Sequence, residues 1–201
     1  MKLRNIFKVL LVLVFSFSFA NALTQSEIQS TMTKKIDTVL SILEKKDLTF
    51  PQKGEKIIKI IDEVFDYELM AKIALGKETW NSISEDKQKK FAKVFEEKLK
   101  KSYINKLELY NDQKVKIIDL KPHNNSRLQL ETELLGKDGT YKINYNFYNR
   151  SKDKEDWLIY DVDLVGVSII QTYRQQFAGL LKEKTFDEML VQFENSDQKQ
   201  W

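Results

Sequence analysis

Two carboxylates and a single histidine are the side chains of this 201-residue chain whose types and spacing best suit acid–base chemistry. Asp161 and Asp163 flank Val162 in a segment with strand-like composition, so both would lie on one face and could titrate as a coupled pair. Solvated strand-end charges, or a cap for the following helix, are the favoured alternative. His123 lies in a stretch rich in Pro and Asn that is typical of a turn, which favours a surface histidine over a general base.

The composition excludes much of the common enzyme repertoire. The chain has no Cys, so it has no disulfides, thiolate zinc sites, iron–sulfur ligands or cysteine nucleophile. One His rules out a multi-histidine metal site and disfavours a Ser-His-Asp triad. There is no Gly-rich phosphate loop, no G-x-S-x-G and no H-E-x-x-H. We therefore expect no catalytic residues, no metal and no cofactor.

A closely spaced set of aromatic and basic residues follows the carboxylates. Tyr173 and Phe177 are four residues apart and share a helical face, which Ile169 extends by one turn. Arg174 is adjacent to this face, where it could pair with a phosphate or with a carboxylate such as Asp161. A structural pair is the favoured interpretation.

Lysines crowd the segment 84–110, which is predicted to be a long helix. A solvated face balanced by Glu96 and Glu97 is the favoured interpretation of such a run. Docking of an acidic partner, or of anionic lipid headgroups, is the alternative.

The first 22 residues predict a cleaved signal peptide. Three basic residues precede an eleven-residue apolar run from Val9 to Phe19, and the small residues Ala20 and Ala22 provide a signal-peptidase site. A spanning helix needs about 20 apolar residues, so cleavage after Ala22 is favoured over a retained anchor. The formal net charge of +3 resides in this segment. The near-neutral remainder does not favour nucleic-acid binding.

Residues 23–194 predict one domain in which helices precede and follow a sheet, and residues 195–201 predict a frayed tail. Apolar residues at three- and four-residue steps predict the helices. Capping patterns before residues 28, 67, 85 and 186 support their starts. The predicted helical ranges are 28–43, 57–65, 67–75, 85–110, 167–182 and 186–193.

From about residue 113 the apolar period changes to two, which predicts antiparallel strands with one apolar face. The predicted strands are 114–120, 127–134, 141–147 and 157–164, and the segment 136–139 predicts a hairpin turn. We therefore expect a curved four-stranded antiparallel sheet with helices on its apolar face. The apolar side chains either fill a core, which is the commoner outcome, or enclose a cavity.

Two blocks of motifs carry a resemblance to a known family. The C-terminal block is Tyr160-Asp161-Val162…Gly166-Val167-Ser168…Tyr173-Arg174-x-Gln176-Phe177, followed by Phe186-Asp187-x-x-Leu190. The N-terminal block is Phe65-Asp66…Met70-Ala71…Leu75-Gly76…Trp80, then Ser84 and Phe91. In these blocks the chain resembles the MlaC family of periplasmic phospholipid-binding proteins, the toluene-tolerance auxiliary components of an ABC transport system. Thr172 departs from the Asn that the family often has, and the spacing to Trp80 is about one residue longer.

The resemblance implies a single α+β domain with a curved, NTF2-like sheet covered by several helices around an apolar pocket. It implies a periplasmic carrier that moves glycerophospholipid between membranes and maintains outer-membrane lipid asymmetry. The implied partners are phospholipid, an inner-membrane MCE-domain permease complex and an outer-membrane lipoprotein complex. The hypothesised pocket residues are Leu69, Ile73, Trp80, Phe95, Leu99, Tyr103, Leu128, Leu130, Tyr145, Phe147, Val162, Ile169, Tyr173 and Phe177.

The physical chemistry of lipids agrees with this implication. Each methylene removed from water contributes about 0.8 kcal/mol, so a two-chain lipid that crosses an aqueous compartment needs a deep apolar pocket. Two other classes stay open. An enzyme on the same sheet would need a carboxylate in the cavity, and a chaperone or adaptor would have a filled core and an exposed apolar patch.

Overall fold

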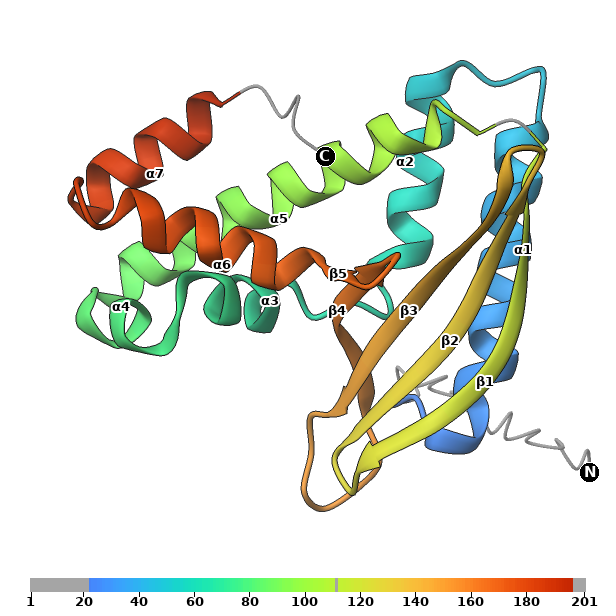
Figure 1. The fold of residues 1–201 in the computed structure, drawn as a ribbon, viewed down its shortest axis with the longest axis horizontal. Coiled ribbons are helices and arrows are strands. Elements are labelled where there is room, and N and C mark those ends of the chain that lie inside the picture. The colour runs from blue at the N-terminus through green and yellow to red at the C-terminus, as the bar shows by residue number, and fades with distance from the viewer. Residues whose placement is uncertain (1–21, 111, 197–201) are drawn as a thin grey trace, which may run out of the picture.

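The computed structural model describes residues 22–110 and 112–196, which form an α+β fold around one antiparallel sheet (Figure 1). The helical elements are η1 Gln25–Glu27, α1 Ile28–Glu44, α2 Phe50–Ile61, α3 Tyr67–Leu75, α4 Lys77–Ser82, α5 Glu85–Leu107, α6 Ile169–Leu180 and α7 Phe186–Asn195. The strands are β1 Lys114–Asn124, β2 Arg127–Gly136, β3 Gly139–Asn149, β4 Trp157–Leu164 and β5 Val167–Ser168, in the order β1-β2-β3-β4-β5.

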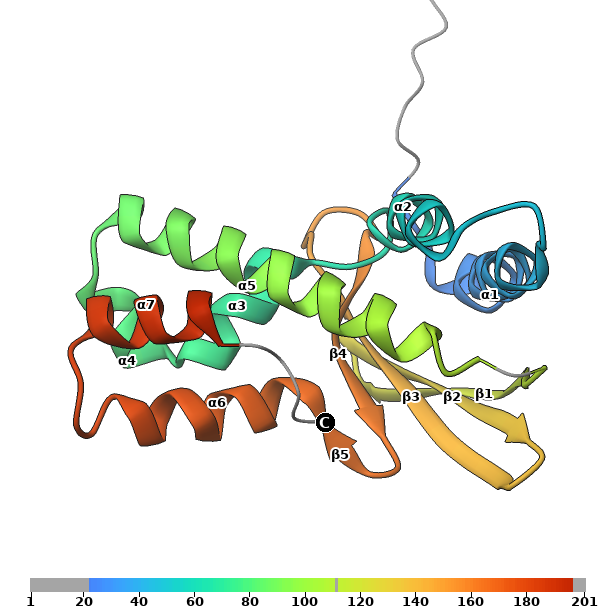
Figure 2. The ribbon, with the colours of Figure 1, turned by 90° about the horizontal axis from the view of Figure 1, so that it is seen from above.

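The elements form two groups that are joined by the long helix α5. The sheet lies at one end with α1 and α2 beside it, and α3, α4, α6 and α7 gather at the other end (Figure 1). Seen from above, α5 runs from the helical group to the sheet end (Figure 2). A single helix therefore contributes to both halves of the fold.

The N-terminal helices begin at capping boxes. The Thr24 N–H donates to a carboxylate oxygen of Glu27 at 3.1 Å, which confirms the predicted cap. The predicted start of the second helix at residue 57 is wrong, because the helix already includes Pro51 in its first turn. Pro is well tolerated in a first helical turn, and Thr49 with Gln52 forms another capping box, so α2 begins at Phe50.

The end of the second helix also differs from the prediction. Val64 and Phe65 were predicted to be helical, but they run beside β4 as a short extended segment. The Ile159 N–H donates to the Val64 carbonyl at 2.8 Å, and the Asp66 N–H donates to the Ile159 carbonyl at 2.9 Å. This segment thus pairs with part of the otherwise free edge of β4.

The start of α3 and the junction that follows it agree with the sequence pattern. The Asp66 carboxylate accepts from the Leu69 N–H at 2.9 Å, as the predicted cap requires. Gly76 ends α3 at φ +89°, a conformation that favours glycine. The short helix α4 that follows was not predicted. Ser84 caps α5 as expected.

The sheet has five strands rather than the predicted four. Val165 and Gly166 adopt positive φ values of 53° and 82° and reverse the chain, so that Val167 and Ser168 pair with β4 before α6 begins. The sequence pattern assigned these two residues to the helix, because a two-residue strand has no measurable period. Pro122 and His123 lie in β1, not in a turn. Pro is tolerated there because β1 is an edge strand.

The buried apolar side chains form three clusters instead of one continuous core. The helical core comprises Met70, Ala71, Ala74, Leu75, Trp80, Phe91, Val94, Phe95, Ile170, Tyr173, Phe177, Met189, Leu190 and Phe193. The sheet core comprises Ile28, Met32, Val64, Leu128, Leu130, Phe147, Trp157, Ile159 and Val162. The α1–α2 core comprises Val39, Ile42, Leu43 and Ile57. A domain of this size more often has one contiguous core.

Asp161 connects the sheet to α6. Its buried carboxylate accepts from the Ser168 hydroxyl at 2.6 Å and from the backbone N–H groups of Val162 at 2.8 Å and Ile170 at 3.1 Å. Asp161 therefore helps Ser168 to cap the following helix, which agrees with one of the two favoured interpretations, but it is buried and is not a solvated charge. Burial raises the pKa of Asp161, and the three hydrogen bonds oppose that rise only in part.

We predict a pH dependence of stability from this carboxylate. Its pKa is raised in the folded state, so the folded protein binds more protons above the ordinary pKa of 3.8, and stability falls as pH rises through that window. Asp161→Asn removes this dependence. Urea unfolding at a series of pH values measures it, and parallel stability curves for the two proteins would contradict the prediction.

Candidate functional site

One face of the sheet changes from closely packed to half-exposed along its length. At the base, Leu128, Leu130 and Phe147 are at most 3% exposed. Towards the β2–β3 hairpin, the same face carries Ile117, Leu134, Tyr141 and Ile143, which we call the distal face. Tyr141 is 44% exposed, and the other three are half-buried. The helices therefore cover the base of the sheet fully and the distal face incompletely.

Strand register sets this arrangement. Leu130 pairs with Tyr145, which in turn pairs with Val162, so the three side chains form a row across β2, β3 and β4. Register shifts occur in β1 and between Asn146 and Phe147 of β3. Such bulges bend strands and increase their twist, so they curve the sheet.

The Tyr103 side chain is partly accessible, although nearby protein atoms affect its phenol. The residue is 37% exposed, yet burial raises the pKa of its phenol to about 12. Burial also raises the pKa of Tyr145 on β3, to which Tyr103 contributes a smaller electrostatic effect. Protein therefore lies around the phenol, although part of the residue's surface stays accessible.

A partly exposed ion-pair network holds α5 one turn before Tyr103. The Lys100 ammonium lies 2.7 Å from Asp62 and 2.6 Å from Glu96, and it stands 4.6 Å from the centre of the Tyr67 ring. Burial lowers the pKa of Lys100, but the two carboxylates outweigh this effect and raise it overall. Burial and then Asp62, which accepts from the Tyr67 hydroxyl at 3.0 Å, raise the pKa of Tyr67.

The hypothesised pocket residues do not line one pocket but are divided between the helical core, the sheet core and positions outside the cores. Four are buried in the helical core, where Phe95 packs 5.0 Å from Tyr173 and Phe177 packs 5.0 Å from Phe193, measured between ring centres. These rings contact one another and the helices around them. The residues in or packed against the helical core are Ile73, Trp80, Phe95, Leu99, Ile169, Tyr173 and Phe177.

The remaining hypothesised residues lie on the sheet or outside all three cores. Leu128, Leu130, Phe147 and Val162 are buried in the sheet core, with Tyr145 and Ile169 packed against it. Leu69 is half-buried, and neither it nor Tyr103 belongs to a core. The distal face was absent from the hypothesis, although its period-two pattern in the sequence was the signal that could have included it.

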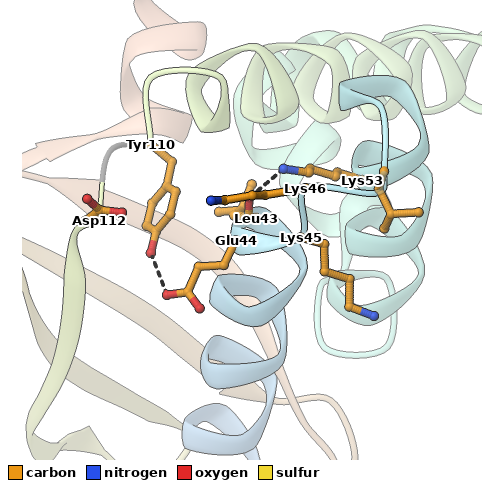
Figure 3. Close-up of a pocket in the computed structure, with 8 residues that line it drawn as sticks. Leu43, Glu44, Lys45, Lys46, Lys53, Tyr110 and Asp112 are labelled. Carbon is orange, nitrogen blue, oxygen red and sulfur yellow. Dashed lines mark hydrogen bonds between the residues drawn. The ribbon is translucent and has the colours of Figure 1, made fainter.

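A pocket of about 550 Å³ lies where the α1–α2 connection meets the end of α5 (Figure 3). Lys53 donates to the Leu43 carbonyl at 2.6 Å, and the Tyr110 hydroxyl donates to Glu44 at 3.4 Å. The charged side chains of Lys45, Lys46 and Asp112 also line it. This pocket is polar and is not the expected apolar one.

A second pocket of about 460 Å³ is also mainly charged. It lies along the N-terminal half of α5, and its lining includes Glu68, Glu85, Lys89 and Lys93 together with one hypothesised residue, Trp80. Within residues 22–110 and 112–196, no group of three or more His, Asp or Glu side chains could hold a metal ion.

The two buried carboxylates have structural partners. Asp156 accepts from the Arg150 guanidinium at 2.6 and 2.8 Å, and Asp161 anchors α6 as described above. His123 is exposed. Hydrogen bonds and ion pairs thus already engage both groups that burial would otherwise make candidates for acid–base chemistry.

Comparison with known proteins identifies the family. Residues 33–195 match the family described as MlaC protein, and this chain belongs to that family. It is 25% identical over 119 residues to the intermembrane phospholipid transport system binding protein MlaC of Haemophilus influenzae. That alignment covers 58% of this chain, and the chain spans only 56% of the length of that relative.

A solved structure has the same fold. It is a phospholipid-binding protein from Ralstonia solanacearum in complex with a phospholipid, with a TM-score of 0.70 and 22% sequence identity. The match covers 83% of this chain and 94% of the other. Among the helices of the described residues, we found none with the length and apolar character needed to cross a membrane.

Because the base is buried and the distal face is not, truncating a side chain at the base should cost more folding stability than truncating one on the distal face. Leu130 and Leu134 point to the same side of β2, but only Leu130 is fully buried. Leu130→Ala should destabilise the protein by about 2–5 kcal/mol, and Leu134→Ala by less than about 1 kcal/mol. Chemical denaturation measures both free energies of unfolding. Equal losses at the two positions would show that the distal face belongs to a packed core.

Proposed function

We propose that this protein is a soluble periplasmic carrier of glycerophospholipid, and that acyl chains occupy the space between the distal face of the sheet and the C-terminal half of α5. The observation that carries the proposal is the incomplete cover of the distal face, together with the accessible Tyr103 of α5, which is near enough to Tyr145 on the same face of the sheet to raise its pKa. Membership of the MlaC family supports the same ligand class.

The three separate cores also support this location. Leu99 borders the helical core, Tyr145 borders the sheet core and Leu107 borders the α1–α2 core. Tyr103, between Leu99 and Leu107 on α5, belongs to none of them. Acyl chains bound between the cores would join them into one continuous apolar interior. A curved NTF2-like sheet that holds an apolar pocket is part of this proposal.

The proposed wall is therefore narrower than the set of residues hypothesised from the sequence. It consists of Leu99, Tyr103, Leu107 and Tyr145 together with the distal face. Trp80, Phe95, Tyr173 and Phe177 are assigned a supporting role, because they pack the helical core against which α5 rests. Leu128, Leu130, Phe147 and Val162 form the closed base of the site.

Affinity in such a site comes mainly from burying methylene groups, at about 0.8 kcal/mol each. It needs no catalytic residue, metal or cofactor. An empty apolar site would expose its lining to water, so the protein should keep its lipid until a membrane complex offers a competing apolar environment. The proposed partners are an inner-membrane MCE-domain permease complex and an outer-membrane lipoprotein complex, which together would maintain outer-membrane lipid asymmetry.

Export through a cleaved signal peptide completes the proposal. The predicted signal, residues 1–22, lies almost wholly outside the described residues. The fold begins immediately after the predicted cleavage site. The Leu23 carbonyl accepts from the Trp157 N–H at 3.0 Å, and the Gln25 N–H donates to Glu155 at 2.7 Å.

Lipid occupancy tests the proposed function. The protein purified from cells should carry phospholipid, and Leu99→Trp should lower the lipid-bound fraction at least about fivefold without unfolding the domain, because the larger ring occupies the wall of the site. Native mass spectrometry followed by organic extraction measures the bound fraction.

The matched control places the same ring on the outer side of the helix. Lys101→Trp, at an exposed position of α5, should leave occupancy unchanged. Purified protein that carries no phospholipid would contradict the proposed carrier function and favour an adaptor with a filled core. Normal lipid occupancy in Leu99→Trp would show that α5 does not line the lipid site.

Processing of the N-terminus is a separate prediction. When the full chain is expressed in a Gram-negative host, the periplasmic protein should begin at Leu23, because Ala20 and Ala22 form the signal-peptidase site. Edman sequencing or intact mass identifies the first residue. A periplasmic or membrane-bound product that retains Met1 would contradict cleavage.

A further inference from the structure

Two tyrosine hydroxyls beside the proposed site, those of Tyr103 and Tyr145, make no hydrogen bond to any of residues 22–110 and 112–196. Other tyrosines of the fold are engaged by charged side chains. Those partners are Asp62 for Tyr67, Glu44 for Tyr110, Asp66 for Tyr148 and Arg127 for Tyr160.

The two hydroxyls lie between the sheet and α5. Tyr145 is on the inner face of β3, in the row between Leu130 and Val162. Tyr103 comes from α5, and it is near enough to Tyr145 to act on it electrostatically. The fully buried Leu128 and Phe147 lie on one side of this row. On the other side Thr132 is still buried, but Ile143 beside it is half-buried and Tyr141 is 44% exposed. The pair therefore stands at the boundary between the apolar end and the accessible end of the site.

Both hydroxyls can still reach water, since Tyr103 is 37% exposed and the Tyr145 hydroxyl is not fully buried. A lipid bound against them would displace that water, and a hydroxyl that then found no acceptor would be unfavourable. Both phenols remain protonated at physiological pH, since burial raises the pKa of Tyr103 to about 12 and raises that of Tyr145 as well. They are thus neutral donors. Lys100, one turn before Tyr103 on α5, is already held by two carboxylates. This environment suits a neutral oxygen acceptor better than a phosphate.

We propose that Tyr103 and Tyr145 donate hydrogen bonds to the ester carbonyl oxygens of the bound lipid, so that the site selects diacyl esters over dialkyl ethers. The inference rests on the proposed function. The ester groups of a glycerophospholipid separate its acyl chains from its headgroup, and the two phenols occupy the corresponding boundary in the protein. Apolar burial alone would not distinguish an ester from an ether of equal chain length.

The test compares a diacyl phosphatidylcholine with a dialkyl ether analogue of the same chain length, each bound to delipidated full-length mature protein. The unaltered protein should bind the ester about tenfold more tightly than the ether. Tyr103→Phe and Tyr145→Phe should each weaken ester binding about fivefold and leave ether binding unchanged. The substitutions remove only the hydroxyls, so unchanged ether binding also reports that the site is intact.

Tyr160→Phe is the matched control. Tyr160 lies on β4 outside the proposed wall, and its hydroxyl accepts from the Arg127 guanidinium at 3.0 Å. Its loss should change neither affinity. Equal binding of ester and ether by the unaltered protein, or an equal loss for both lipids in the tyrosine variants, would overturn the inference and leave the carrier intact. Binding of neither lipid would overturn both the inference and the proposed function.

Discussion

The fold depends on how the apolar face of its sheet is kept from water. At the base, helix α1 and the segment before α3 supply Ile28, Met32 and Val64, and the packing there leaves almost no accessible surface. Beyond the row of Leu130 and Tyr145, the cover by protein side chains becomes incomplete. A half-exposed apolar sheet face is stabilised when another apolar surface covers it. In the proposed function the two acyl chains of a phospholipid would provide that surface, and the three cores of the protein could stay as they are.

Helix α5 makes this arrangement possible because it is held at several points along its length. Its first half is fixed in the helical core by Phe91 and Phe95, and its middle is fixed by the contacts of Lys100 with Asp62 and Glu96. Its second half can therefore extend over the sheet without packing tightly against it. These ion pairs are partly exposed, and together they hold the middle of the helix against Asp62, outside α5.

Much of this fold could be predicted from local sequence patterns. The capping residues Asp66, Ser84 and Thr185, the period-two strands and the cap role of Asp161 all depend on neighbours within a few residues, and such signals are readable in one sequence. Strand β5 and the pairing of Val64 with β4 were missed because they depend on contacts across the fold. The division into three cores was missed for the same reason, since Phe177 and Tyr103 have similar apolar spacing but entirely different surroundings.

The central claim is that acyl chains lie between the sheet and α5. A crystal structure of the protein purified with its lipid tests this most directly. The account predicts continuous hydrocarbon density that contacts Tyr103, Tyr145 and the distal face. A lipid-bound structure with chains placed elsewhere, or a crystal structure in which protein side chains close the distal face completely, would contradict it.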